Sequence, residues 1–331
     1  MSSGTLTCRL AQIDVQPGRP RVNTSTILQH IETAIQDDVE LLVFPEMAIP
    51  GYLLGDEWEH QAFLRQCEAC GHQVREASQG ITVVFGNVAI DWQRRNEDGR
   101  VRKYNALFVA EDGEFVSPEN SPYPFSIKAL MPNYRQFDDS RHFFDLRKLA
   151  FEEHGNIESL LTPFKTRRAV LGCILCEDAW DIDYAVSPLA ILGARKEIDL
   201  FINASASPFT LDKNHKRNRV FAAHARHLGR PLLYVNKVGI QNNGKTVFTF
   251  DGASSVYDAH GNHIRCGEPF EATTLTIDLP LGQDATFADH SSPQHDTIAD
   301  TPTAITYGTR RVLELCGVER AVIGVSGGIT P

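Results

Sequence analysis

Short apolar runs alternate with amphipathic helices along most of the 331 residues of this chain. The apolar runs that we expect to form strands cover residues 6–13, 40–44, 81–90, 170–176, 198–203 and 232–236. The expected helices cover residues 23–35, 58–77 and 213–228, and hairpins are expected at 104–116 and 254–266. Strand–helix alternation favours parallel strand pairs, whereas hairpins favour antiparallel ones. The sequence therefore predicts the α/β class, with α+β character from its mixed sheets.

The composition is that of a folded protein with a substantial core, because 42% of the residues are hydrophobic and 22% are charged. The formal net charge of −10 disfavours binding to nucleic-acid phosphates and to anionic membranes. The N-terminal residues lack the basic region and apolar stretch of a signal peptide. Seven cysteines, an odd number, suggest reduced thiols. We therefore expect a cytoplasmic protein that binds neither nucleic acid nor membrane.

A cysteine stands at the end of one expected strand. Cys176 follows the apolar run that begins at Ala169, and the polar residues Glu177 and Asp178 come directly after it. A thiol in this position is held rigidly, and the backbone N–H groups of the following turn can point at an oxyanion. Free cysteine more often packs in a protein core, so the position alone does not establish a nucleophile.

Two further segments carry residues that suit the same chemistry. Glu46 follows an apolar run that Pro45 ends, and a carboxylate beside apolar residues tends to have the raised pKa of a general base. Lys128 lies between apolar residues, where it could stabilise developing negative charge and lower the pKa of a neighbouring thiol. Taken singly, a solvated loop glutamate and a surface lysine are the simpler interpretations.

Together, the three segments resemble the nitrilase superfamily of carbon–nitrogen hydrolases. The matching motifs are Phe44-Pro45-Glu46 with Gly51-Tyr52 following, Lys128 with Met131-Pro132-Asn133-Tyr134 following, and Cys176-Glu177-Asp178-Ala179-Trp180 after a strand. The resemblance covers roughly residues 4–280 and implies a four-layer αββα sandwich. It implies Glu46 as general base, Lys128 as stabiliser of the oxyanion and Cys176 as nucleophile. Within the superfamily, the second and third segments are most similar to the glutaminase domain of glutamine-dependent NAD synthetase.

The same resemblance implies glutamine as the substrate. The binding residues that it implies are Tyr52, Tyr134, Glu177, Ser207 and Lys213. Ser207 and Lys213 match positions that hold the amino-acid head group, the two tyrosines match aromatic residues that line the pocket, and the backbone N–H of Glu177 would help to bind the oxyanion. In the implied reaction the thiolate attacks the side-chain amide, ammonia leaves, and water hydrolyses the thioester. No metal or organic cofactor is implied for this domain.

The chain changes in character after residue 284. Residues 1–284 would form the nitrilase-like amidohydrolase domain. Residues 285–303 are polar, with two prolines and little periodicity, and are expected to be a linker. The resemblance implies that residues 304–331 are the truncated beginning of an ATP-pyrophosphatase domain, as in NAD synthetases.

The motifs of the last segment carry that expectation. Residues 304–320 form a helical pattern that Gly317 ends, and residues 321–325 form a strand pattern that runs into Ser326-Gly327-Gly328. The family's pyrophosphate loop continues with Asp and Ser, where this sequence has Thr330 and Pro331. We therefore expect ATP and magnesium to bind only in an intact synthetase, and this chain not to synthesise NAD.

Other spacings are weaker signals. Cys67 and Cys70 have a Cys-x-x-Cys spacing, but no second pair follows at the distance of a zinc ribbon, and both lie on an expected helix. His224 and His227 repeat this geometry without a carboxylate partner. The basic cluster at 213–219 is too short for a nucleic-acid surface. We expect core packing for the cysteines, and no metal site.

Three classes of function remain open. The first is the glutaminase domain of an NAD synthetase, which would pass ammonia to a synthetase domain. The second is a stand-alone amidase that acts on another small amide or nitrile. The third is a non-catalytic protein that binds partners through its helical faces. The Glu–Lys–Cys set counts against the third class, and the C-terminal motifs favour the first over the second. We further expect a homo-oligomer.

Overall fold

The computed structural model describes residues 4–134, 137–153, 155–242, 244, 246–281, 287, 297–322 and 324, and its strands form two large sheets and one small one. The first sheet contains, in order, β15 (Thr273–Pro280), β1 (Thr5–Gln12), β2 (Leu41–Val43), β3 (Thr82–Arg95), β4 (Val101–Glu111) and β5 (Glu114–Val116), with β6 (Ser126–Ile127) paired to β4. The second contains β14 (His263–Cys266), β13 (Ser255–Tyr257), β10 (Leu232–Asn236), β9 (Leu200–Ser205), β8 (Val170–Leu175) and β7 (Phe164–Lys165). The third pairs β11 (Val238–Asn242) with β12 (Val247–Asp251).

Both large sheets are mixed. In the first, β1, β2 and β3 are parallel, and in the second β8, β9 and β10 are parallel. Their outer strands are added in antiparallel pairs, such as β1 with β15 and β10 with β13. The predicted combination of strand–helix crossovers and hairpins is therefore confirmed.

Alternating side chains place the two large sheets face to face. In β8, Leu171, Cys173 and Leu175 pack into the core between the sheets, whereas Ile174 packs into the core on the other face. This division follows from the two-residue period of a strand. The first sheet contributes the facing side chains Leu6, Cys8, Leu10, Leu41 and Val43.

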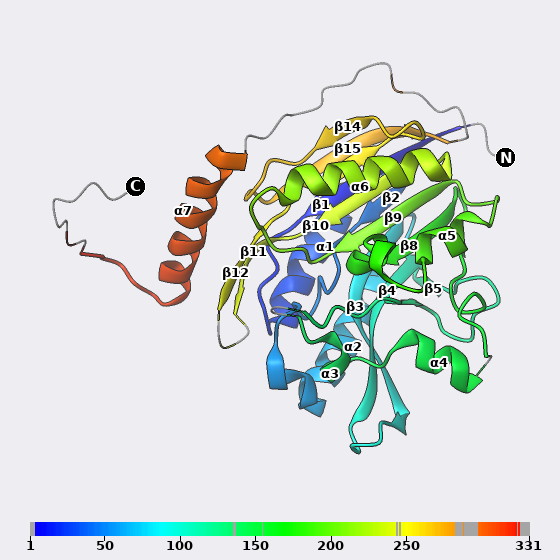
Figure 1. The fold of residues 1–331 in the computed structure, drawn as a ribbon, viewed down its shortest axis with the longest axis horizontal. Coiled ribbons are helices and arrows are strands. Elements are labelled where there is room, and N and C mark those ends of the chain that lie inside the picture. The colour runs from blue at the N-terminus through cyan, green and yellow to red at the C-terminus, as the bar shows by residue number, and fades with distance from the viewer. Residues whose placement is uncertain are drawn as a thin grey trace.

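Helices cover the two outer faces. α1 (Pro20–Gln36) and α2 (Gln61–Ala77) pack on the first sheet, where Ile27, Ile31 and Val74 join its outer core. α5 (Pro188–Gly193) and α6 (Lys213–Leu228) pack on the second sheet, and α6 ends at Gly229, whose φ of 60° suits glycine. The four layers, helices–sheet–sheet–helices, form the predicted αββα sandwich (Figure 1).

Shorter elements connect these layers. They are the 3₁₀ turns η1 (Gly55–Glu59), η2 (Cys176–Ala179) and η3 (Asp181–Asp183) and the helices α3 (Asp139–His142) and α4 (Leu146–Glu153). The helix expected at 58–77 is divided into η1 and α2, because His60 has an extended backbone that ends η1 before α2 begins.

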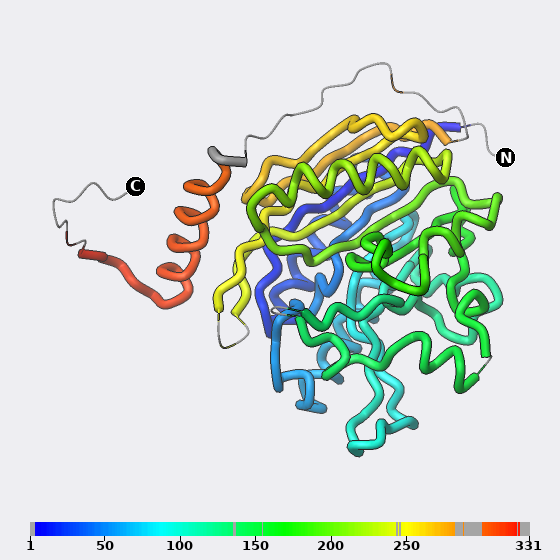
Figure 2. The backbone as a smooth tube through the Cα atoms, in the orientation of Figure 1, coloured from blue at the N-terminus to red at the C-terminus, as the bar shows by residue number. Residues whose placement is uncertain are grey.

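The helix α7 (Thr297–Leu315) stands at one side of the sandwich, beside the β11–β12 hairpin (Figures 1 and 2). It begins at Thr297, inside the segment expected to be a linker. The sequence did not indicate this start, because the polar residues before 304 have no apolar periodicity that would mark a helix. Its contacts with the sandwich include an ion pair and a ring contact. Arg311 forms an ion pair with Asp14, and the ring of Tyr307 lies 5.6 Å from that of Phe270.

The strand expected at 321–325 does not form in the part that is described. Residues 321, 322 and 324 lie outside any strand, and Val322 is 99% exposed. An apolar run becomes a strand only where a neighbouring strand accepts its hydrogen bonds. Ser326-Gly327-Gly328, Thr330 and Pro331 lie outside the described residues, as does most of the expected linker.

Candidate active site

Cys176 stands at the turn between β8 and η2. Its backbone φ of 39° lies in the left-handed region, which residues other than glycine rarely adopt. The Nδ2 of Asn203, on the neighbouring strand β9, donates a hydrogen bond of 3.2 Å to the carbonyl of Cys176. The thiol is thus held at a sharp strand-to-helix turn, where it borders a cavity.

Glu46 lies three residues after β2 and is completely buried. Its Oε1 accepts hydrogen bonds from Asn105 Nδ2 at 2.7 Å and from Lys128 Nζ at 3.0 Å, and its Oε2 accepts one from the backbone N–H of Ala206 at 2.8 Å. Gly86 on β3 permits this arrangement, because a Cβ at this position would lie 2.7 Å from the carbonyl carbon of Glu46. The carboxylate is therefore fixed in one orientation.

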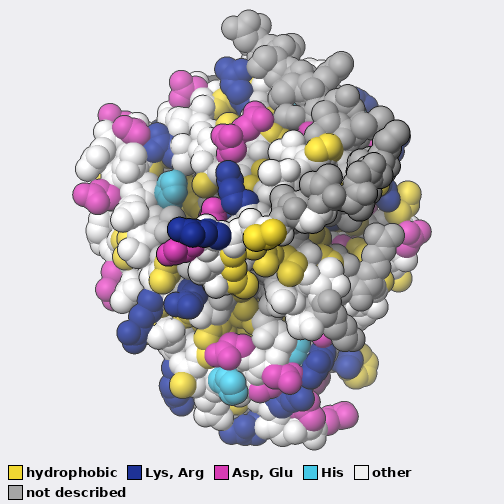
Figure 3. Space-filling view, turned by 90° about the vertical axis from the view of Figure 1, so that its left-hand side faces the viewer, with side chains coloured by type: hydrophobic (Ala, Val, Ile, Leu, Met, Phe, Trp, Pro, Cys, Tyr) yellow, Lys and Arg dark blue, Asp and Glu magenta, His cyan; other side chains and the backbone are white. Residues whose placement is uncertain are grey.

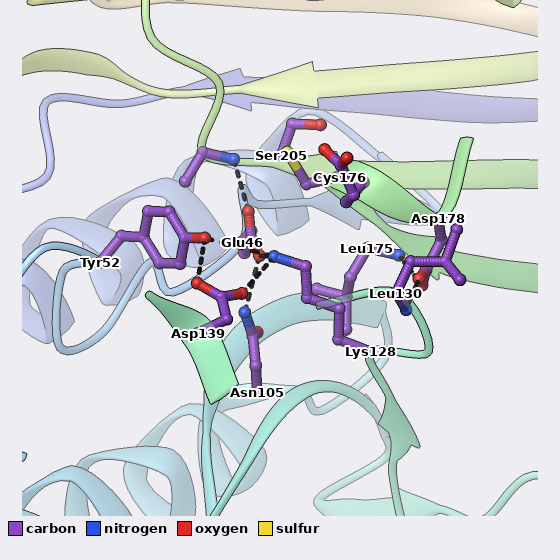
Figure 4. A network of polar contacts seen from close by, with 12 residues as sticks. Glu46, Tyr52, Asn105, Lys128, Leu130, Asp139, Leu175, Cys176, Asp178 and Ser205 are labelled. Carbon is purple, nitrogen blue, oxygen red and sulfur yellow. Dashed lines mark hydrogen bonds and ion pairs between the residues drawn. The ribbon is translucent and has the colours of Figure 1, made fainter. Parts of the chain in front are cut away.

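Lys128 follows β6 directly and is also completely buried. Besides Glu46, its ammonium donates to Asp139 Oδ2 at 2.7 Å and lies 3.3 Å from the hydroxyl of Tyr52. Tyr52 in turn donates to Asp139 Oδ1 at 2.6 Å. Figure 4 shows the ammonium between the two carboxylates, with Cys176 beside Glu46.

The electrostatics of the three predicted catalytic residues are coupled. Burial, and to a smaller extent Glu46, raise the pKa of the Cys176 thiol to about 12 against the lowering effect of Lys128. Burial opposes the charge on Lys128, but Asp139 and Glu46 outweigh it and raise the pKa of the ammonium. The lysine is therefore charged and the resting cysteine is a thiol, which needs a base to take its proton.

A cavity of about 590 Å³ opens above Cys176. Its lining includes four of the five predicted binding residues: Tyr134, Glu177, Ser207 and Lys213. Tyr52 does not line this cavity; it is 4% exposed and lies beneath the site, against Lys128 and Asp139. The expectation that Tyr52 lines the pocket therefore differs from its position in the structure, where its hydroxyl donates to Asp139 and accepts from Lys128.

Charged groups of both signs face this cavity. The carboxylate of Glu177 accepts hydrogen bonds from the hydroxyls of Tyr134 at 3.0 Å and Tyr184 at 2.9 Å. Lys213 Nζ donates to the carbonyl of Pro208 at 3.1 Å, and burial, with a smaller effect of the nearby Arg217, lowers the pKa of Lys213 to about 8. The cavity can thus receive a small zwitterionic molecule.

Sequence reasoning missed several residues of the site. Asp139 holds Lys128, and the carboxylate of Asp178 accepts hydrogen bonds from the backbone N–H groups of Ala129, Leu130 and Leu175 at 3.0, 2.8 and 3.0 Å. Asp178 thus joins the segment of Lys128 to the strand of Cys176. Asp178 lies inside a motif quoted above, whereas Asp139 follows the Lys128 motif, and the sequence does not distinguish it from its neighbour Asp138.

The described residues contain no group of three or more His, Cys, Asp and Glu side chains placed to hold a metal ion. Cys67 and Cys70 are buried in apolar cores, and His224 Nε2 lies 2.8 Å from the carbonyl of Ala179. Nor does any helix in the described part of the chain combine the length and the apolar character needed to cross a bilayer.

Comparison with known proteins identifies the class to which this sandwich belongs. The family model for carbon–nitrogen hydrolases matches residues 8–287, so the chain belongs to the carbon–nitrogen hydrolase family. The predicted resemblance to the nitrilase superfamily is thereby confirmed, and the chain is an enzyme of the hydrolase class.

Two curated relatives of the chain belong to one kind of enzyme. The chain is 30% identical to the glutamine-dependent NAD(+) synthetase of Thermotoga maritima over 276 residues, which are 83% of this chain and 42% of the relative. It is 27% identical to that of Synechocystis sp. over an alignment of 333 positions, which covers 98% of this chain and 55% of the relative. The chain thus spans about half the length of the curated relatives it matches.

Solved structures show the same fold. The glutamine-dependent NAD+ synthetase of Acinetobacter baumannii matches with a TM-score of 0.77 and 23% identity, covering 95% of this chain and 53% of that one. An amidase from Nesterenkonia sp. matches with a TM-score of 0.64 and 19% identity, covering 85% of this chain and 92% of that one.

Proposed function

We propose that this chain hydrolyses the side-chain amide of glutamine to glutamate and ammonia. The observation that carries the proposal is the buried ammonium of Lys128, held between Glu46 and Asp139 beside a cysteine at the floor of a cavity. The names of the most similar relatives supply the substrate class. The cavity offers Glu177 to the α-amino group of an amino acid and Lys213 to its α-carboxylate.

The reaction follows from these positions. Glu46 takes the proton of Cys176, and the thiolate attacks the amide carbon. Lys128 and the backbone N–H of Glu177 stabilise the oxyanion of the tetrahedral intermediate. Glu46 then donates its proton to the leaving ammonia, which leaves a thioester on Cys176. Finally Glu46 activates a water molecule that hydrolyses the thioester, and the cysteine regains its proton.

We further propose that the ammonia serves a synthetase domain such as the relatives' names imply. The hydrolytic steps themselves use only side chains and backbone groups of this chain, so we propose that they need no cofactor. ATP and magnesium would belong to the synthetase domain, where ammonia amidates deamido-NAD. We also propose that the protein assembles as a homo-oligomer.

A substrate panel with two cysteine variants tests the proposed reaction. Glutamine, asparagine, simple aliphatic amides and nitriles are incubated with the protein, and ammonia and the acid product are measured. Glutamine should be the preferred substrate, and Cys176→Ala should abolish its turnover. Cys173→Ala is the matched control, because this cysteine packs between the sheets and should affect only stability. Glutamine turnover that survives Cys176→Ala, or a preference for aliphatic nitriles, would contradict the proposal.

A further inference from the structure

Lys237 is a buried amine that the proposed reaction does not use. It lies between β10 and β11 with no exposed surface, and its Nζ has no hydrogen-bond partner within the described part of the chain. The Nζ instead lies 4.3 Å from the ring centre of Phe250 and 5.9 Å from that of Tyr52. A buried amine without a hydrogen bond is unfavourable for folding, so its presence calls for another explanation.

Tyr52 connects this amine to the catalytic cluster. The ring centre of Tyr52 lies 5.1 Å from Lys128 Nζ, and its hydroxyl donates to Asp139. The cluster contains two carboxylates, of Glu46 and Asp139, but only one ammonium. With both carboxylates ionised it therefore has one more negative than positive charge, on side chains that are almost completely buried.

We propose that Lys237 is a positioning residue for Glu46 and Cys176, and that its ammonium supplies the positive charge that this buried cluster lacks. The inference rests on the proposed function, since it concerns the same base and nucleophile. Lys237 acts through the electrostatic field and not by touching the substrate. An ammonium at this position attracts the negative charge that proton transfer places on Cys176, and so favours the thiolate.

The charges around Lys237 fit this role. Burial lowers the pKa of Lys237 to about 7, against the opposing influence of Glu46, then Asp14 and Cys176, which all favour its ammonium form. The amine thus titrates near neutral pH and responds to the charge of the site. Asp14 also forms an ion pair with Arg311 of α7, and this positive charge weakens the attraction between Asp14 and Lys237.

The rate at which Cys176 reacts with iodoacetamide tests the proposal without any substrate. The extent of alkylation of the Cys176 peptide is followed by mass spectrometry from pH 5 to 10 in the unmodified protein, in Lys237→Met and in Lys237→Gln. Loss of the positive charge should slow the reaction about tenfold below pH 7, where Lys237 is an ammonium, and the difference should vanish at higher pH, where the amine of the unmodified protein is already neutral. The melting temperature is measured alongside, so that a loss of folded protein is not mistaken for a slower reaction of Cys176.

Lys103→Met is the matched control. Lys103 is another buried lysine, but it is paired with Glu59 at 2.9 Å, so its loss should lower the melting temperature and leave the Cys176 profile in place. An unchanged profile in both Lys237 variants would overturn the proposal, as would a lower melting temperature without a shift. If the profile shifts in a protein that does not hydrolyse glutamine, the proposed function fails and the role of Lys237 stands.

Discussion

At the scale of single residues, the site consists of charges and strain that folding alone would not favour. Lys128 is fully buried between Glu46 and Asp139, and removing one partner from such a buried ion pair typically costs about 3–5 kcal/mol. Cys176 has a φ of 39°, a conformation that costs about 1–3 kcal/mol for a residue other than glycine. Under the proposed function, both features would bring the reacting groups together.

Asp139→Asn should show how much the ion pair between Asp139 and Lys128 contributes to activity. The variant keeps the shape of the side chain but removes one of the two charges that keep the lysine ionised, so kcat for glutamine should fall by about 10² or more. Asp138→Asn is the control, because its side chain is 56% exposed and does not touch Lys128. Steady-state kinetics of both variants, with melting temperatures alongside, make the comparison, and equal losses would show that Asp139 has no special role.

Lys213 should give the binding of glutamine a pH dependence. Its pKa is lowered to about 8, so the ammonium is present below that pH and is lost as the pH rises through it. If it attracts the α-carboxylate, KM for glutamine should rise about tenfold between pH 7 and pH 9, while kcat changes less. Lys213→Arg keeps its charge throughout and should flatten the rise. A KM that is independent of pH in the unmodified protein would show that Lys213 does not bind the carboxylate.

At the scale of elements, each of the three proposed catalytic residues stands just beyond the end of a strand. Cys176 follows β8 directly, Lys128 follows β6 directly, and Glu46 lies three residues after β2. Because the sheets pack face to face, these three ends meet at one edge of the sandwich. Asp178 fixes their spacing through its hydrogen bonds to the backbone around Lys128 and before Cys176.

Gly86→Ala should displace Glu46 without touching any catalytic side chain. The new Cβ would lie 2.6 Å from the carbonyl of Pro45 and 2.7 Å from the carbonyl carbon of Glu46, so the chain after β2 must move. We expect a loss of about 1–3 kcal/mol in the free energy of unfolding, measured by chemical denaturation, and a fall of 10-fold or more in kcat. Gly4→Ala, with open space around it, should change neither, and full activity in Gly86→Ala would contradict this role of the glycine.

At the scale of the whole molecule, the sandwich was predictable because its strands and helices leave strong periodic patterns. The apolar run before Cys176 and the pattern of α6 (Lys213–Leu228) specify those elements almost residue for residue. The roles of Asp139 and Lys237 could not be predicted, because they depend on which distant side chains lie beside them. Tyr52 was expected to line the pocket because it matches a motif position, but a motif does not show in which direction a side chain points.

The side of the molecule that carries α7 was the least predictable. A cavity of about 490 Å³ lies between α7 and β12, and its lining includes Val247, Phe248, Ile305 and Val312. Hydrophobic side chains are visible near the middle of this face (Figure 3). The β11–β12 hairpin that forms the other wall escaped prediction, since its short strands have no strong alternation of apolar residues.

Covalent labelling of the nucleophile tests the central claim most directly. A diazo-ketone analogue of glutamine alkylates an activated thiol with loss of dinitrogen, and peptide mass spectrometry locates the adduct. We predict one adduct per chain, on Cys176, and its formation should parallel the loss of ammonia release. Glutamine should prevent the labelling in proportion to its concentration. The adduct should be absent in Glu46→Gln on the same timescale. Labelling of another cysteine, or full labelling with turnover intact, would contradict the account.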